Sequence, residues 1–157
     1  MMDLGAPAAC VWLTGRRGSG KRTIGTAVAE ALRSDGRPCA LLDAEALATH
    51  LARGPADGGL ASLVWLSRLL TDNGVTTIVT VDLASRTDRD AVRAEMPGFI
   101  EVYVDAPADV CTDRVGVADP RYEEPIAPDL RIPTHDRDAR ASAAQLMSYL
   151  ERLITPT

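Results

Sequence analysis

The chain has 157 residues, of which 46% are hydrophobic, and a formal net charge of −5. This length suits one domain with a core, and the negative charge argues against general binding to nucleic acids or to membrane surfaces. The apolar runs are strand-sized and the N-terminus lacks the pattern of a signal peptide, so we expect a cytoplasmic protein without a membrane span.

The most specific pattern lies between an expected strand at residues 9–14 and an expected helix at residues 23–32. It is a glycine-rich loop of the form G-x-x-x-x-G-K, and Lys21 is the only lysine in the chain. Such a loop brings backbone N–H groups against phosphates, its lysine reaches the terminal ones, and the following helix favours anions. The sequence therefore predicts a nucleotide-binding P-loop made of Gly15, Gly18, Ser19, Gly20, Lys21, Arg22 and Thr23.

One position of this loop departs from the pattern. A Ser or Thr after the lysine normally supplies a hydroxyl to Mg²⁺, whereas this chain has Arg22. Thr23 comes one residue late, and one step along a helix turns a side chain by about 100°. The loop thus predicts nucleotide binding without predicting metal-dependent catalysis, and Arg22 could itself pair with a phosphate.

The remaining sequence alternates strand-like and helix-like segments. Strands are expected at 39–42, 76–81, 99–104 and 130–132, and helices at 44–53, 60–72, 86–95, 108–114 and 136–154. This alternation predicts an α/β, P-loop NTPase fold with a parallel sheet flanked by helices on both faces. Ligands of such sheets bind beyond the carboxyl ends of the strands, where Asp43, Asp82 and Asp105 each close a strand.

Several smaller expectations concern individual side chains. Asp82 follows a β-branched strand, as a Mg²⁺-binding aspartate does, although a solvated strand end is equally open. Asp105 is expected to cap the next helix. The mixed charges at 86–93 predict a solvated helix face, and Trp65 is assigned to packing in the core or at an interface. The three cysteines (Cys10, Cys39 and Cys111) lie in apolar segments and are expected to be buried, reduced thiols.

Taken together, a series of segments resembles adenylylsulfate kinase. The matching segments are 11–15, Leu42 with Asp43, 86–93, 99–107, Val110 and Cys111 with Arg114, 122–125, and 128–130. Their order and most of their spacings match from about Cys10 to the C-terminus. The resemblance implies one P-loop kinase domain over 1–157 that uses Mg-ATP to phosphorylate the 3′-hydroxyl of adenylylsulfate.

The resemblance also implies roles for individual residues. Arg114 would lie along the adenine, and Asp43 would accept or orient the proton of the acceptor hydroxyl. Asp82 and Glu45 would be available to hold Mg²⁺. Lys21 would act on the phosphates during transfer.

The departures from the family are concentrated on the acceptor side. The family's arginines after the second strand and around the third helix fall at Ala48, Ala61 and Ser62, its mobile basic lid is absent, and its base-stacking aromatic is Val115. A substrate with a phosphate and a sulfate needs several cationic donors. We therefore do not expect adenylylsulfate to be the natural acceptor.

Three functions stay open from the sequence. The first, which we favour, is an ATP-dependent kinase that phosphorylates a small-molecule hydroxyl other than adenylylsulfate. The second is a catalytically impaired nucleotide-binding sensor or partner protein, in which Arg22 supplies a fixed positive charge. The third is an adenylylsulfate kinase whose missing arginines come from a partner chain. A homodimer stays open as the assembly, and a requirement for Mg²⁺ would separate the first two functions.

Overall fold

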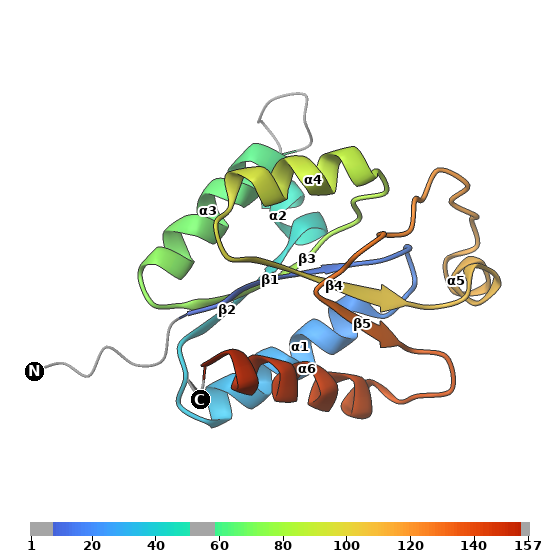
Figure 1. Cartoon of the computed structure of the whole chain (residues 1–157). Coiled ribbons are helices and arrows are strands. Elements are labelled where there is room, and N and C mark those ends of the chain that lie inside the picture. Colours follow the sequence, from blue (N-terminus) through green and yellow to red (C-terminus); the bar gives the residue numbers. More distant parts are fainter. Residues whose placement is uncertain (1–7, 51–58, 155–157) are drawn as a thin grey trace, which may run out of the picture.

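The computed structural model describes residues 8–50 and 59–154. A five-stranded sheet has the strand order β2-β3-β1-β4-β5, and all four neighbouring pairs are parallel. The strands are β1 (Cys10–Thr14), β2 (Cys39–Asp43), β3 (Thr76–Thr80), β4 (Phe99–Asp105) and β5 (Leu130–Pro133). The predicted fold is confirmed, and all five strands end at the same edge of the sheet (Figure 1).

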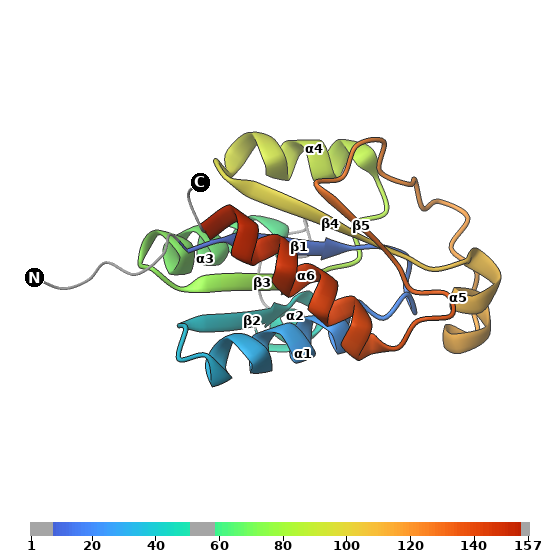
Figure 2. The same cartoon turned by 60° about the horizontal axis from the view of Figure 1, so that its bottom comes forward.

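Helices cover both faces of this sheet (Figures 1 and 2). On one face lie α1 (Lys21–Ser34) and α6 (Ala139–Ile154), which contact each other. On the other face lie α2 (Ala44–His50), α3 (Leu60–Asp72) and α4 (Arg86–Glu95). The short helix α5 (Ala108–Val115) lies beyond the carboxyl end of β4 and comes close to the loop that follows β1.

The two helical layers enclose two hydrophobic clusters, and β1 contributes to both. Val11 and Leu13 point into the cluster under α1 and α6, whereas Cys10 and Trp12 point into the cluster under α3 and α4. Side chains alternate between the faces of a strand, and a central parallel strand is covered on both sides. The five residues of β1 are therefore all buried, and the strand is a fixed base for the loop after it.

The bounds of the fully described helices agree with the predicted ranges to within three residues, and two of their starts differ for a local reason. Helix α1 begins at Lys21 rather than at residue 23, because Gly20 already caps it with a backbone φ of 100°. Helix α6 begins at Ala139 rather than at residue 136. Asp136 has a left-handed φ of 61°. The Asp138 carboxylate accepts a hydrogen bond from the N–H of Ala141 at 2.7 Å, as a helix cap does. The predicted helix 44–53 is seen as Ala44–His50, and its last residues lie outside the described ranges.

One assignment of a single residue was wrong, and another loses one of its two alternatives. Asp105 does not cap α5, whose N-cap residue is Pro107, because its carboxylate instead accepts hydrogen bonds from Nη2 and Nε of Arg131 at 2.6 and 2.9 Å. Trp65 does not pack in the core of this chain, since it is 65% exposed on α3. The role of Trp65 at an interface between chains stays a prediction.

The cysteines lie in the apolar layers of the fold. Cys10 and Cys111 are buried, Cys39 is half-buried, and all three are free thiols. Burial raises the pKa of the Cys10 thiol to about 11, and it also raises the pKa of Cys39 and of Cys111. A protonated thiol is a poor nucleophile and a poor metal ligand, so these side chains serve packing.

Candidate functional site

The loop between β1 and α1 has the backbone that a phosphate-binding loop requires. Gly15, Gly18 and Gly20 have φ values of 150°, 82° and 100°, which side-chain-bearing residues rarely adopt. At Gly15 an added Cβ would lie 2.5 Å from the carbonyl oxygen of Val104. The glycines therefore let the loop pass close to β4 and turn directly into the N-terminus of α1.

Lys21 folds back over this loop and is largely buried. Its Nζ donates hydrogen bonds to the carbonyl oxygens of Gly15 and Arg16, both at 2.9 Å. It also lies 2.7 Å from the carboxylate of Asp82, which follows β3. The carboxylate of Asp82 is half exposed and is also approached by Arg17 at 3.5 Å. The ammonium group is thus held at the centre of the loop, with Asp82 as its counter-ion.

Arg22 is tied to the other end of the site, at β2 and α2. Its Nε and Nη2 donate to the two carboxylate oxygens of Asp43 at 2.9 and 3.0 Å, and Nη2 also donates to Glu45 at 3.0 Å. We call these three side chains the Arg22 clamp. The fork-shaped pairing with Asp43 is the strong, bidentate geometry of a guanidinium and a carboxylate.

Asp43 accepts four hydrogen bonds in this arrangement. Two come from Arg22, one from the N–H of Ala46 at 2.8 Å, and one from the hydroxyl of Thr80 at 2.7 Å. Burial alone would raise the pKa of the Asp43 carboxyl, but these hydrogen bonds and the Arg22 charge hold it below its usual value. A carboxylate with a lowered pKa is a weak proton acceptor, so it orients a hydroxyl more readily than it deprotonates one.

The loop, the Arg22 clamp and the start of α6 line one pocket of about 540 Å³. Of the residues predicted for the site, all except Gly15 line it; they are Gly18, Ser19, Gly20, Lys21, Arg22, Thr23, Asp43, Glu45, Asp82 and Arg114. Arg114 comes from α5 and donates to the carbonyl oxygen of Gly18 at 2.9 Å. The structure therefore brings together residues that lie up to 96 positions apart in the sequence.

Sequence reasoning missed the wall of the pocket that follows β5. Thr134, Arg137 and Ser142 line it, and the buried hydroxyl of Ser142 has no hydrogen-bond partner among the described residues. The Thr134 hydroxyl contacts the carbonyl oxygens of Asp105 at 3.2 Å and of Ser19 at 3.4 Å, and the contact with Ser19 holds the turn after β5 beside the P-loop. The sequence held one signal for this wall. The turn follows a predicted strand, so it lies at the carboxyl edge of the sheet, where ligands bind.

A family model described as adenylylsulphate kinase matches residues 7–121, well over half of the chain. The chain belongs to the adenylylsulfate kinase family. Adenylyl-sulfate kinase of Rippkaea orientalis is 31% identical over 166 residues and is matched over 91% of either chain.

Two solved structures place the fold beside known kinases. The APS kinase of Mycobacterium tuberculosis, solved in complex with AMPPNP and APS, has a TM-score of 0.83 and 26% identity, over 93% of this chain and 99% of that one. A sugar kinase from Janibacter, solved without a ligand, has a TM-score of 0.68 and 26% identity, over 96% and 97%. The resemblance read from the motifs is thus confirmed, and the family is one of P-loop, ATP-binding kinases.

Membership of the adenylylsulfate kinase family implies a magnesium ion beside the phosphates. The residues that line this pocket do not fit such an ion. Arg22 replaces the hydroxyl ligand, Asp82 is paired with Lys21, and Glu45 is paired with Arg22. Within residues 8–50 and 59–154, no three His, Cys, Asp or Glu side chains gather as metal ligands would. A Mg²⁺ ion needs oxygen ligands in octahedral geometry, and the carboxylates of this site are occupied by cationic side chains.

Arg16 has a structural role in this member of the adenylylsulfate kinase family. Its guanidinium stacks 4.8 Å from the ring centre of Tyr122, and Nη1 donates to the carbonyl oxygen of Asp119 at 3.3 Å. The Arg16 side chain is therefore held by contacts within the chain. Arg17 remains exposed at the rim of the pocket.

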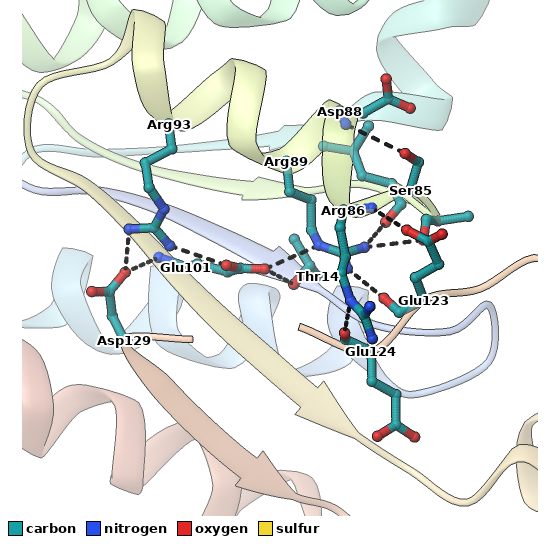
Figure 3. Close-up of polar contacts among 12 residues, drawn as sticks. Thr14, Ser85, Arg86, Asp88, Arg89, Arg93, Glu101, Glu123, Glu124 and Asp129 are labelled. Carbon is teal, nitrogen blue, oxygen red and sulfur yellow. Dashed lines mark hydrogen bonds and ion pairs between the residues drawn. The ribbon is translucent and has the colours of Figure 1, made fainter. Parts of the chain in front are cut away.

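Part of the charged run on α4 belongs to a buried ionic network around Glu101, not to a solvated helix face (Figure 3). Arg89, expected on a solvated face of α4, has a side chain that is 3% exposed and lies 3.2 Å from the Glu101 carboxylate. It also donates to the carbonyl oxygens of Leu83, Ala84 and Glu123. Arg93 reaches the same carboxylate at 3.0 Å. The network joins the segment after β3, the strand β4 and the segment that carries Tyr122.

The structure also bears on the expectation about membranes. In the described part of the chain, no helix combines the length and the apolar character that crossing a bilayer would require.

Proposed function

We propose that this chain is an ATP-binding P-loop phosphotransferase that acts on a small-molecule hydroxyl other than adenylylsulfate. The observation that carries the proposal is the charge on the pocket wall beside β2. On this wall the carboxylates of Asp43 and Glu45 both form ion pairs with the single arginine, Arg22. Such a wall favours a neutral or cationic acceptor over one that carries a phosphate and a sulfate.

The proposed roles follow from the positions of the side chains. Lys21 and the N–H groups at the start of α1 hold the terminal phosphates of ATP, where the ammonium and the helix dipole offset developing negative charge. Asp43 orients the acceptor hydroxyl beside Arg22. Arg114, which lies against the loop at Gly18, contacts the base side of the nucleotide. These roles use positioning and charge, which dominate phosphoryl transfer.

The similarity to a sugar kinase from Janibacter supports an uncharged, hydroxyl-rich acceptor. A pocket of about 540 Å³ has the size of a small-molecule site. With Ala48 on α2 and Ser62 on α3 at the positions of the family's substrate arginines, these helices bring no cation there.

A second candidate is a nucleotide-binding protein with little or no kinase activity. The observation that favours it is the set of four hydrogen bonds that Asp43 accepts. An acceptor hydroxyl would have to compete with these donors for the carboxylate. In this case ADP would bind and no hydroxyl compound would stimulate its release from ATP.

Adenylylsulfate is expected not to be phosphorylated. Purified protein given ATP and adenylylsulfate should release ADP no faster than protein given ATP alone, because the one arginine on the pocket wall beside β2, Arg22, is already paired with Asp43 and Glu45. The same coupled assay, run over neutral polyols, sugars and amino alcohols with and without Mg²⁺, should find at least one acceptor that stimulates ADP release. Efficient formation of the 3′-phosphorylated product from adenylylsulfate would disprove the altered specificity. If no compound in the panel stimulates ADP release although ADP still binds, the second candidate is favoured.

A further inference from the structure

We propose that the guanidinium of Arg22 takes the place of a divalent cation in this site, so that a nucleoside di- or triphosphate binds as the metal-free anion. This inference rests on the nucleotide site of the proposed function and adds how that site is charged. It applies whether or not a phosphoryl group is then transferred.

The position of Arg22 is the first observation. It is the second residue of α1, directly after Lys21, and it lines the same pocket as the phosphate-binding loop. This is the position from which a Ser or Thr hydroxyl would hold Mg²⁺ beside the phosphates. A permanent cation therefore lies at the residue that normally recruits one.

The clamp around Arg22 is the second observation. A guanidinium carries five N–H donors, and the contacts with Asp43 and Glu45 use those of Nε and Nη2. Among the described residues, Nη1 has no hydrogen-bond partner. The two carboxylates therefore hold the group in place while part of its donor edge stays available for phosphate oxygens.

The competition for carboxylates is the third observation. A divalent ion at this site would have to take Asp43 or Glu45 from Arg22, or Asp82 from Lys21, and it would then lie beside the displaced cation. Like charges at such short range repel strongly. A nucleotide that keeps the Arg22 clamp intact avoids this repulsion and gains the guanidinium as its counter-ion.

The test is calorimetric titration of the full chain with ADP, once in buffer with a chelator and once in buffer with millimolar MgCl₂. For the wild type we expect dissociation constants that agree within about threefold between the two buffers. For Arg22→Ser, which restores the hydroxyl and frees Asp43 and Glu45, we expect Mg²⁺ to tighten binding by about tenfold or more. Arg33→Ser, a change at the far end of the same helix, is the matched control and should behave as the wild type.

Two outcomes would overturn the inference. One is a loss of wild-type affinity of about tenfold or more on chelation, which would leave the nucleotide site itself standing. The other is an Arg22→Ser protein that is as indifferent to Mg²⁺ as the wild type. If ADP binds in neither buffer, the proposed function falls as well. Should Arg22→Ser fail to fold, Arg22→Lys keeps the charge without the fork, and its binding should be weaker than wild type yet still indifferent to Mg²⁺.

Discussion

Replacing Lys21 with alanine is expected to remove most of the affinity for ATP and ADP. Its ammonium group lies at the centre of the P-loop, and a charge-assisted contact of this kind is worth about 1.5–3 kcal/mol, or roughly 10- to 150-fold in affinity. No second lysine exists in the chain to compensate. Titration calorimetry with ADP, run beside Arg33→Ala as a control on the same helix, measures the loss.

The stability of the Lys21→Ala protein separates a binding effect from a folding effect. Asp82, the counter-ion of Lys21, is half exposed and stays close to Arg17, so the variant leaves no buried unpaired charge. Its thermal unfolding without nucleotide should therefore lie close to that of the wild type. Unchanged affinity for ADP in a folded Lys21→Ala protein would contradict the P-loop assignment.

Replacing Arg89 with methionine is expected to be the most destabilising single change described for this chain. The substitution leaves the Glu101 carboxylate, with a side chain only 7% exposed, without its most buried partner. Breaking a buried ion pair in this way costs about 3–5 kcal/mol. In a domain of this size that lowers the unfolding temperature by roughly 6–20 °C.

The matched control for Arg89→Met is Arg93→Met. Arg93 comes from the same helix and contacts the same carboxylate, but its side chain is 39% exposed, so water can replace it. Its loss should cost no more than about 1 kcal/mol. Differential scanning calorimetry of both variants measures the difference, and equal melting temperatures would show that burial does not govern the strength of this network.

The sequence was sufficient for the sheet, for the helices and for the P-loop because each of these depends on local pattern. Alternation of apolar strands with helical segments constrains a parallel sheet, and glycines at Gly15, Gly18 and Gly20 have few other uses at such spacing. The aspartates that close β2 and β3 were also placed correctly beside the loop, since parallel strands end at one edge.

What the sequence could not supply was the partner of each charged side chain. Phosphate pairing by Arg22 was predicted and stays a prediction, but its contacts with Asp43 and Glu45 were not foreseen. Arg89 lies in a run of mixed charges that is typical of a solvated face, and only the buried glutamate in the middle of β4 hinted otherwise. Pairing depends on tertiary distances of a few ångströms, and periodicity carries no information about them.

The distribution of charge within the pocket has a consequence for how a ligand arrives. Five basic and three acidic side chains line it, although the whole chain is negative. The acids lie toward β2 and β3, whereas Arg114 and Arg137 lie toward α5 and α6 and pair with no carboxylate among the described residues. The separation of charge makes the pocket an electric dipole in a protein of net negative charge. This field attracts a polyanion to the α5 and α6 side and orients it before it binds. Because salt screens the field, the association rate should fall as ionic strength rises.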